Sequence, residues 1–254
     1  MTTATATCRT TAKSIKVMPL LEVIACSVAD AVEAEKGGAD RLEIVRDLKR
    51  GGLTPPYELV QKIKQRVGLP LRVMLRENDG FETRDDEIDR LCVAAERFAS
   101  LEVDGFVLGF LRDGEVDLER TQRVLACAPN VRATFHHAFE AARDKLRALS
   151  AIKQLAQVDR ILSSGGTDDL KSRVQRLDEY ERAAAPELMI LAGGGIDRDA
   201  IINIGRETRI REFHVGRAAR AEFDVEGAVQ ASLVSGLVQK LKEIPYVISN
   251  SEAT

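Results

Sequence analysis

The chain of 254 residues is 44% hydrophobic and 30% charged, which is ordinary for a soluble globular protein and long enough for one eight-stranded α/β barrel. A net charge of -3 excludes a general attraction to nucleic acid or anionic membranes, and no apolar run approaches the roughly 20 residues that cross a bilayer. Four cysteines without regular spacing argue against a disulfide framework or zinc finger and favour a reducing, cytoplasmic compartment.

The two ends of the chain are expected to be tails. Residues 1–17 are polar and rich in threonine, and they lack the apolar core of a secretory signal. We expect a disordered tail there, with a transit-like segment as the alternative, and a short second tail over 246–254. No linker or shift in composition interrupts residues 18–245, which predicts one domain.

Short apolar runs alternate with longer amphipathic stretches along this domain. Most are near-continuous, as is typical of strands buried on both faces of a parallel sheet. Between them lie helical patterns, such as the apolar residues at helical spacing in Asp85–Ser100. Strict alternation predicts a single (β/α)8 barrel of the TIM type, and an open doubly wound sheet is the alternative. The eight predicted strands are Leu20–Cys26, Arg41–Val45, Leu71–Arg76, Gly105–Phe110, Val131–His136, Asp159–Ser163, Leu188–Ala192 and Glu212–Gly216.

All three histidines of the chain fall at the ends of predicted strands. His136 and His137 end the fifth strand, and His214 lies near the end of the eighth. In a barrel, ligands meet the loops that follow the strands. Strand alternation places only one of two neighbours inside, and we expect this to be His136. Two histidines that converge on one mouth favour a functional role over a hydrogen-bonded structural one.

Charged residues interrupt several of the predicted strands. A charge buried on both faces must be paired or used, because leaving it unpaired is costly. Glu22 and Glu43 lie on neighbouring strands, where they could oppose arginines. Two compatible interpretations stay open: a layer of ion pairs that lines the barrel, and a catalytic site of two carboxylates, an arginine and one or two histidines. The residues concerned are Glu22, Arg41, Glu43, Arg72, Arg76 and Glu212.

Glycines follow the last three predicted strands. Barrels often hold a phosphate in this place with backbone N–H groups, because glycine lets the backbone come close to an anion. The alternative is a set of tight turns that merely need positive φ. The expected anion-binding residues are Ser163, Gly165, Gly193, Gly194, Gly195, Gly216 and Arg217.

Some chemistries are disfavoured by what the predicted strands lack. No lysine lies in or directly after a strand, which argues against a Schiff-base aldolase, and no G-x-S-x-G, P-loop or H-E-x-x-H motif occurs. A lyase or isomerase that acts on a small phosphorylated or carboxylated molecule fits. His136 or Glu43 would be its acid or base, and Arg76 would hold a carboxylate or polarise a carbonyl.

Nine segments together resemble the CutC copper-homeostasis family: LEV at 21–23, GGADRLEI at 37–44, GGLTPP at 51–56, VMLR at 73–76, DGFVLG at 104–109, TFHHAFE at 134–140, ILSSGG at 161–166, GGGI at 193–196 and EFHVGRA at 212–218. The resemblance implies a TIM-type barrel with a deep pocket, copper binding and a homo-oligomer. The activity of the family is poorly defined, which leaves an enzyme role open. The resemblance carries over Glu22, Arg41, Glu43, Arg76, His136, the glycines 193–195, Glu212 and His214.

The chain departs from the family pattern at two cysteine positions. Family members resemble LEVCVDS and IELC, and here Ile24 and Val45 stand at those cysteines. Cu(I) prefers thiolate and thioether ligands. The nearest substitute is Cys26, on the same strand face as Ile24, and we expect it to bind copper with His136. Three functions therefore compete: a copper protein, a barrel enzyme and a scaffold without chemistry.

Overall fold

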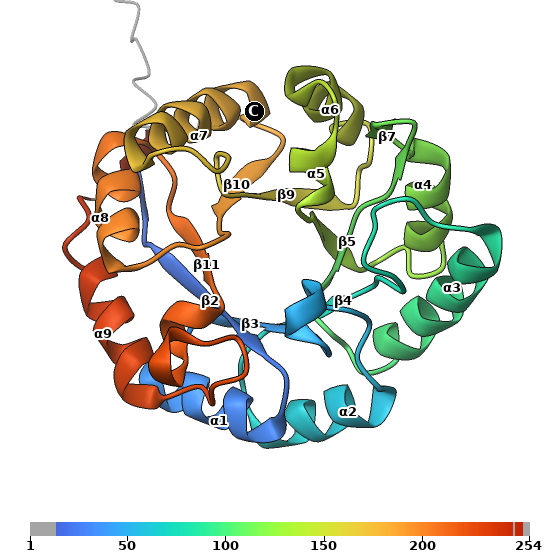
Figure 1. Ribbon diagram of the computed structural model, residues 1–254, viewed down its shortest axis with the longest axis horizontal. Coiled ribbons are helices and arrows are strands. Elements are labelled where there is room, and N and C mark those ends of the chain that lie inside the picture. Colours follow the sequence, from blue (N-terminus) through green and yellow to red (C-terminus); the bar gives the residue numbers. More distant parts are fainter. Residues whose placement is uncertain (1–13, 246, 251–254) are drawn as a thin grey trace, which may run out of the picture.

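Eight parallel strands close into a barrel ringed by helices in a computed structural model, which describes residues 14–245 and 247–250 (Figure 1). The strand order around the barrel is β10-β11-β2-β3-β4-β5-β8-β9. This closure confirms the predicted single (β/α)8 barrel and excludes the open doubly wound sheet. Among the described residues, no helix is both long and apolar enough to cross a membrane.

The barrel strands begin within one residue of the predicted positions, and each ends at the predicted residue or up to two residues before it. They are β2 Leu20–Ala25, β3 Arg41–Ile44, β4 Leu71–Met74, β5 Gly105–Leu108, β8 Arg132–Phe135, β9 Val158–Ser163, β10 Met189–Ala192 and β11 Glu212–Val215. The α-helices are α1 Val28–Gly37, α2 Tyr57–Arg66, α3 Asp85–Ala99, α4 Leu118–Ala126, α5 Ala138–Ala141, α6 Lys145–Ile152, α7 Leu170–Ala184, α8 Arg198–Glu207 and α9 Ala231–Leu241. Shorter elements are β6 Leu111–Arg112, β7 Glu115–Val116, η1 Leu48–Arg50, η2 Arg217–Ala219 and η3 Ala221–Phe223.

A separate pair of strands joins segments near the two ends of the chain. β1 Ser14–Val17 and β12 Val247–Asn250 run antiparallel. The expected tails over 1–17 and 246–254 are therefore corrected at these positions, where short β-branched runs favour strand pairing. The remainder of both expected tails lies outside the described residues.

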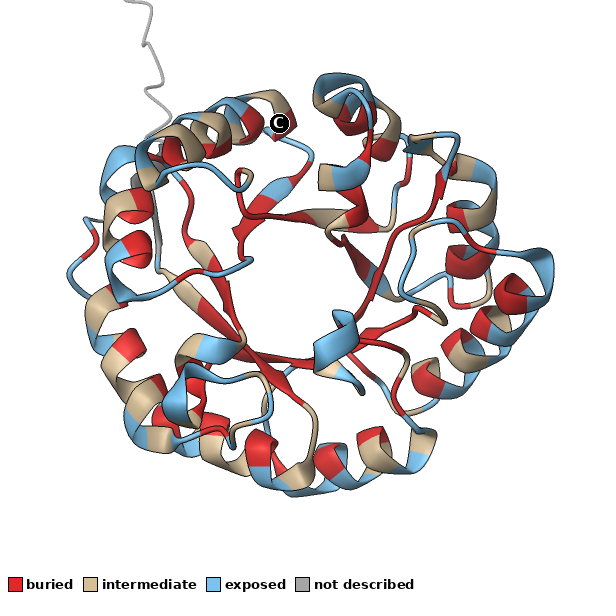
Figure 2. Cartoon of the chain, viewed as in Figure 1, coloured by how far each residue is buried: buried red, intermediate tan, exposed pale blue. Residues whose placement is uncertain are grey.

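Apolar side chains form two layers, one on each face of the barrel strands. Alternation along β2 explains this arrangement: Val23 packs outward into the large core under the helices, whereas Ile24 points inward. Buried residues accordingly follow the strands and the inner faces of the helices (Figure 2). The inner apolar layer lies towards the ends of the strands and comprises Ile24, Val45, Met74 and Val107.

The segment between β3 and α2 is tied to the end of β4. α2 begins after Pro56. Before it, the Thr54 hydroxyl accepts a hydrogen bond from the Arg76 N–H at 2.8 Å and donates to the Arg76 carbonyl at 3.0 Å. These bonds fix the loop that covers part of the barrel opening.

Candidate functional site

The floor of the barrel interior is a connected set of ion pairs, here called the floor network. Arg160 binds both carboxylate oxygens of Glu212, at 2.6 and 2.8 Å. Arg72 binds both oxygens of Asp159, each at 2.8 Å, and Arg41 reaches Glu212 at 2.9 Å. An ion-pair layer of this kind is one of the two interpretations of the charged strand residues that the sequence allows. The members of the floor network are Glu22, Arg41, Arg72, Asp159, Arg160 and Glu212.

His214 connects the floor network to the opening above it. One oxygen of Glu22 pairs with Arg41, and the other lies 2.8 Å from His214 Nδ1. The Nε2 atom of His214 lies 3.4 Å from Glu43 Oε2. Burial lowers the pKa of His214, but the two carboxylates outweigh burial and raise it overall. The two carboxyl groups therefore favour the protonated form of His214.

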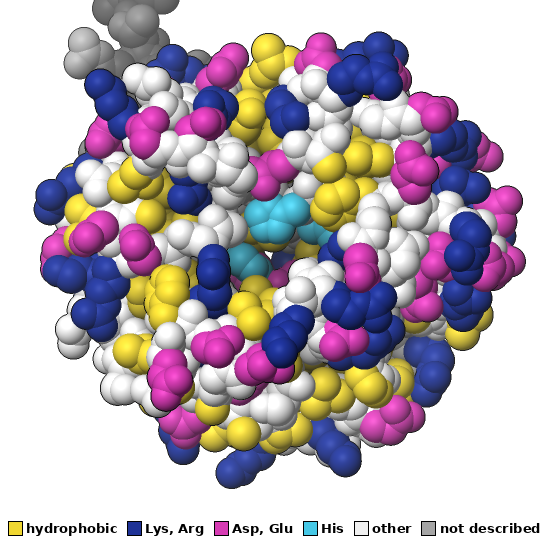
Figure 3. Space-filling view, in the orientation of Figure 1, with side chains coloured by type: hydrophobic (Ala, Val, Ile, Leu, Met, Phe, Trp, Pro, Cys, Tyr) yellow, Lys and Arg dark blue, Asp and Glu magenta, His cyan; other side chains and the backbone are white. Residues whose placement is uncertain are grey.

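A cavity of about 440 Å³ opens above the floor, at the C-terminal ends of the strands, which we call the mouth. Figure 3 shows histidines, in cyan, in the hollow at the centre of this face. Polar side chains that line the cavity are Glu43, Arg76, His136, His137, His214 and Arg217. The other lining residues are Ile24, Val45, Leu48, Gly51, Met74, Phe81, Leu162, Gly194, Gly195, Gly216 and Val225.

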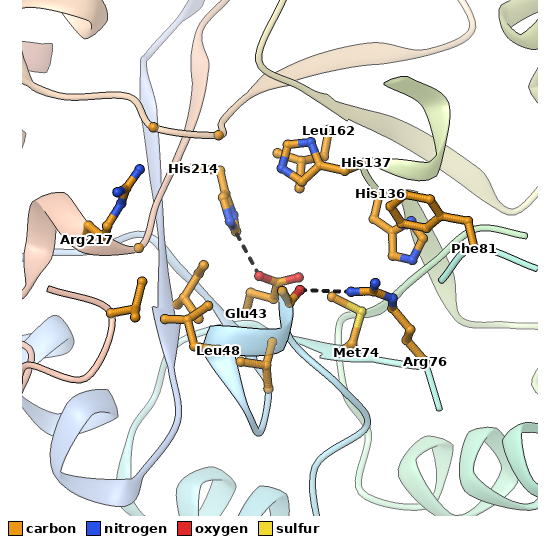
Figure 4. Close-up of a pocket in the computed structure, with 17 residues that line it drawn as sticks. Glu43, Leu48, Met74, Arg76, Phe81, His136, His137, Leu162, His214 and Arg217 are labelled. Atoms are coloured by element: carbon orange, nitrogen blue, oxygen red, sulfur yellow. Dashed lines mark hydrogen bonds and ion pairs between the residues drawn. The ribbon is translucent and has the colours of Figure 1, made fainter. Parts of the chain in front are cut away.

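Glu43 is a buried carboxyl group, and the nearby charge of His214 only partly offsets the cost of burying it. Its side chain points towards His214 in Figure 4, but the separation of 3.4 Å makes this a weak contact. Its Oε1 atom has no hydrogen-bond partner among the described residues. Burial raises the pKa of Glu43 to about 7. Near neutral pH the group is thus present as both acid and base, as general acid–base catalysis requires.

His136 is a buried, neutral hydrogen-bond donor. Its Nδ1 atom accepts the Ala138 N–H at 3.2 Å, which assigns the ring proton to Nε2. Burial and the charge of Arg76 hold its pKa well below the usual range. The Nε2 atom is buried and has no partner in the part of the chain that the structure describes. Glu43 and His136 therefore bring an unused acceptor and an unused donor to the same cavity.

His137 also lines the cavity, so the expectation that only one of the paired histidines points inward is wrong. The reason is that β8 ends at Phe135, and strand alternation ends with it. His137 already has helical dihedral angles, φ -57° and ψ -6°, as the cap of α5. Its Nδ1 atom lies 2.8 Å from Glu140 Oε2, one helical turn further on.

Glu140 orients His137 and was missed by sequence reasoning. Its Oε1 atom accepts hydrogen bonds from the Ser163 hydroxyl at 3.0 Å and from the Ser164 N–H and hydroxyl, both at 2.7 Å. Burial raises its pKa, but His137 and Ser164 lower it to about 2 overall. The carboxylate contacts Nδ1 of His137 and so fixes the orientation of the ring, with Nε2 on the opposite edge. The signal in the sequence is the H-x-x-E spacing at the start of a helix.

Arg76 holds two loops together at the mouth. Its Nη1 atom donates to the carbonyl groups of Arg50, Gly51 and Gly52, each at 3.3 Å, and Nε donates to Gly80 at 3.3 Å. Of the two dashed lines in Figure 4, the one that ends at Arg76 marks one of these bonds. Among the described residues this guanidinium forms no ion pair with a carboxylate, so backbone carbonyl groups stabilise its charge.

The glycine segments after β9 and β10 separate into two groups. Gly194 and Gly195 line the cavity in the left-handed region, with φ of 80° and 71°. Gly193 is not part of the lining, and a Cβ there would lie 2.5 Å from Leu162. A Cβ on Gly165 would meet the Arg173 carbonyl of α7 at 2.5 Å, away from the cavity.

The predicted site residues therefore divide between the cavity and its support. Those that the structure brings to the cavity are Glu43, Arg76, His136, His214, Gly194, Gly195, Gly216 and Arg217. Those that lie outside its lining are Glu22, Arg41, Ser163, Gly165, Gly193 and Cys26. Glu22 and Arg41 support His214 from the floor, and Ser163 supports His137 through Glu140.

Cys26 and His136, the predicted copper ligands, line different hollows. Cys26 borders a shallow one beside Arg220, whose Nη2 atom lies 3.6 Å from the sulfur. Cys26 directly follows the end of β2 and packs against the inner apolar layer that contains Ile24, on the face that alternation predicts, but it does not line the cavity. Burial raises the pKa of its thiol to about 11. Within residues 14–245 and 247–250, no three His, Cys, Asp or Glu side chains are grouped so as to hold a metal ion.

Comparison with known proteins matches the CutC family model over residues 19–219. A CutC family protein of Xylella fastidiosa is 33% identical over 196 residues, 76% of this chain and 73% of that protein. The copper homeostasis protein cutC homolog of Homo sapiens is 35% identical over 198 residues, 77% of this chain and 72% of that protein.

Solved structures agree with the observed fold. A CutC protein from Streptococcus agalactiae has a TM-score of 0.73 and 25% identity, and the match covers 78% of this chain and 98% of that chain. Orotidine 5'-monophosphate decarboxylase from Methanocaldococcus jannaschii has a TM-score of 0.61 at 18% identity, over 89% of this chain and 99% of that chain. The second likeness concerns the fold alone.

Proposed function

The chain belongs to the CutC family, and from that premise we propose that its mouth is an active site for general acid–base chemistry on a small anionic molecule. One observation carries the proposal: two buried atoms of one cavity, Glu43 Oε1 and His136 Nε2, lack partners among the described residues. A buried polar atom without a hydrogen bond costs about 1–3 kcal/mol. A ligand that meets both atoms removes this cost.

Each polar group at the mouth has a distinct role in such a reaction. Glu43, with a pKa of about 7, takes a proton from the substrate or returns one. His136 donates its Nε2 proton in a hydrogen bond to an oxygen that gains charge. His137, oriented by Glu140, is a second group for proton transfer. A lyase or isomerase reaction, in which one group removes a proton and another supplies one, uses all of these groups.

The charge of the cavity favours an anionic substrate. Arg76 and Arg217 bring positive charges to the lining, and neighbouring carboxyl groups favour the protonated form of His214, whereas Glu43 is the one carboxyl group of the lining among the described residues. A cleft lined by one sign of charge raises the local concentration of ligands with the other sign. The volume of about 440 Å³ suits a small metabolite, and Gly194 and Gly195 let its phosphate or carboxylate approach the backbone.

Exchange of substrate hydrogen with solvent tests the proposal. The protein is incubated in D2O with small phosphorylated and carboxylated carbonyl compounds, and deuterium next to the carbonyl is followed by NMR. We expect exchange that falls by about 10²–10⁴-fold in Glu43→Gln. The control is Glu243→Gln, at an exposed residue that pairs with Lys240. A compound that binds at the mouth and exchanges equally fast with Glu43→Gln contradicts the proposal.

A second candidate function is copper handling, which we infer from the resemblance and from the name of the human relative. Met74 and the three histidines contribute a thioether and imidazoles to the cavity. Cu(I) prefers thiolate, however, and no cysteine belongs to this lining in the described chain. The residues at the mouth therefore do not fit a thiolate copper site. Anaerobic Cu(I) titration against a chelator tests Cys26: binding lost in Cys26→Ala supports this candidate, and unchanged binding contradicts a role for Cys26.

The resemblance also carries our proposal that the chain forms a homo-oligomer in the cytoplasm. Light scattering after size-exclusion chromatography tests the first part, because one chain has a mass of 27.9 kDa. A multiple of this mass supports the proposal, and the mass of a single chain at micromolar concentration contradicts it. Fractionation of cells that produce the protein tests its location.

A further inference from the structure

One wall of the cavity at the mouth is apolar. Four side chains of one packed cluster line the cavity there, and we call them the apolar wall: Ile24, Val45, Leu48 and Met74. They come from β2, from β4, from the residue after β3 and from the start of η1, so neighbouring strands bring them to one side of the barrel. In Figure 4, Leu48 and Met74 lie across the cavity from His137. The polar groups of the mouth thus account for only part of its lining.

The apolar wall differs from the ordinary filling of a barrel, in which layers of branched apolar side chains pack against each other. Val107 on β5 is an example of that filling, because it belongs to the same cluster and is 1% exposed but does not line the cavity. Val45 is equally buried, at 1%, and does line it. A ligand in the space of about 440 Å³ would therefore contact Val45 but not Val107.

A glycine keeps part of the apolar wall uncovered. Gly216 directly follows β11 and lines the cavity. A Cβ at this position would lie 3.1 Å from Ile24 Cδ1 and 4.0 Å from Leu48 Cδ2. A larger side chain here would occupy the space beside two members of the apolar wall. The cavity reaches their carbon atoms because residue 216 has no side chain.

Positive charge lies in another part of the same cavity. Arg217 lines the cavity beside Gly195, where a Cβ would lie 3.6 Å from the Nη2 atom of Arg217. Gly194 and Gly195 are the residues at which the proposed function places the anionic group of the substrate. One end of a ligand would therefore meet charge and backbone, while the other end meets carbon. Ligand pockets commonly combine apolar walls with a few polar groups that fix orientation.

We propose that the anionic ligand of the mouth carries an aliphatic portion of several carbon atoms, which the apolar wall binds. This inference rests on the proposed function and narrows its substrate class. A short, fully polar anion leaves the apolar wall in contact with water, whereas an aliphatic portion removes that contact. Each methylene group buried in this way raises the affinity by about fourfold. Affinity is therefore expected to increase with the length of the aliphatic chain.

Titration of the full chain with acetate, butanoate and hexanoate, and with ethyl, butyl and hexyl phosphate, tests the inference. The methionine methyl groups are labelled with carbon-13 and followed by NMR, and Met74→Leu assigns the resonance of Met74. In the series whose anion the mouth prefers, we expect the affinity to rise by about fourfold for each added methylene group. The Met74 resonance should move on binding, whereas the exposed Met18 and Met189, which lie outside the lining, report non-specific binding.

Two matched valines separate ligand binding from packing. Val45→Ala removes two methyl groups from the apolar wall, so its affinity for the six-carbon ligand should fall by about fourfold or more, with the two-carbon ligand unaffected. Val107→Ala removes the same groups from the same cluster outside the lining, and it is expected to bind every ligand as the natural chain does. Circular dichroism of each variant verifies folding.

Three results overturn the inference. The first is an affinity that does not rise with chain length in either series, and the second is an equal loss of affinity in Val45→Ala and Val107→Ala. The third is 1-hexanol that binds as tightly as the charged six-carbon ligands, which would leave no role for the anionic group. These titrations measure binding without a chemical step. Their failure is thus distinguishable from failure of the exchange assay with Glu43→Gln.

Discussion

On the floor of the barrel, Arg160 donates hydrogen bonds to both carboxylate oxygens of Glu212. At the mouth, by contrast, one carboxylate oxygen of Glu43 has no hydrogen-bond partner among the described residues. Both regions place charged side chains inside the same parallel strands. They differ in how far the hydrogen-bonding capacity of those side chains is used. The charged groups of the floor network are paired with one another and with neighbours such as His214 and Thr134, whereas Glu43 and His136 at the mouth have an acceptor and a donor without partners among the described residues.

This difference shows that a buried charge is a poor marker of a site by itself. A buried charge that is fully paired supports the fold, and removing one partner leaves the other uncompensated. A buried group that the protein leaves unsatisfied is available to a ligand. His214 belongs to both regions, because it binds Glu22 below and faces Glu43 above. Four substitutions test this difference between floor and mouth, with the free energy of unfolding as the measured quantity.

The largest effect is expected from Arg41→Ala on the floor. Arg41 is 3% exposed and pairs with Glu22, which is 1% exposed, so the variant leaves a buried carboxylate with His214 alone. We expect the free energy of unfolding to fall by about 3–5 kcal/mol in urea denaturation. Lys240→Ala breaks an exposed ion pair and serves as the control, with a loss below about 0.5 kcal/mol. Equal losses in the two variants would refute a structural role for the floor network.

The next largest effect is expected at Glu140, which lies beside the mouth but has hydrogen-bond partners for both of its carboxylate oxygens. Its pKa falls from 4.5 to about 2 in the folded chain, so its carboxylate stabilises the fold above pH 4.5. This contribution, about 3 kcal/mol, disappears as the pH falls through the folded value. We expect Glu140→Gln to be less stable than the natural chain at pH 7, with the gap closing between about pH 5 and 2. A difference in the free energy of unfolding that stays constant with pH would contradict a lowered pKa of Glu140 in the folded chain.

Glu43→Gln is expected to have the opposite sign. Its pKa rises from 4.5 to about 7 on folding, so the folded state resists ionisation of this carboxyl. The resulting cost is absent below pH 4.5, grows as the pH rises, and is complete above pH 7. We expect the variant to be more stable than the natural chain by about 1–3 kcal/mol at pH 8, and equal to it at pH 4. Denaturation at both pH values measures this, and lower stability at pH 8 counts against an unsatisfied Glu43.

The smallest effect is expected at the rim, where Lys49 and Glu226 pair at 2.7 Å. Both side chains are about three-fifths exposed, at 60% and 62%, so water screens their attraction. Glu226→Gln should change the free energy of unfolding by less than about 0.5 kcal/mol. A change above about 1 kcal/mol would show that rim charges behave like those of the floor.

The sequence was sufficient to predict the barrel and much of the mouth. Eight apolar runs separated by helical patterns are local signals, and they set the strand starts to within one residue. Charged residues inside those runs had to be buried, so Glu22, Glu43 and His214 could be assigned to the interior. Which of them were satisfied could not be predicted, because pairing depends on contacts between strands distant in sequence.

The errors share a physical cause at the strand ends. Alternation predicts which way a side chain faces only while the backbone is extended, and the extended backbone of β8 ends at Phe135, before His137. His137 therefore turns into the cavity. Cys26 lies against the inner apolar layer, as alternation predicts, but it lines a different hollow from His136. Gly165 likewise packs on α7, because the loop after β9 folds back on that helix. Loop geometry of this kind is set by tertiary contacts.

Titration of the Glu43 carboxyl by carbon-13 NMR tests the central claim most directly. Uniformly labelled protein is followed across the pH range, and Glu43→Gln assigns the resonance by its loss. An unsatisfied, buried Glu43 predicts a carboxyl that titrates at about 7, and the resonance should move when a small anion binds at the mouth. If the assigned resonance titrates below about pH 5, Glu43 is an ordinary, satisfied carboxylate and the mouth resembles the floor.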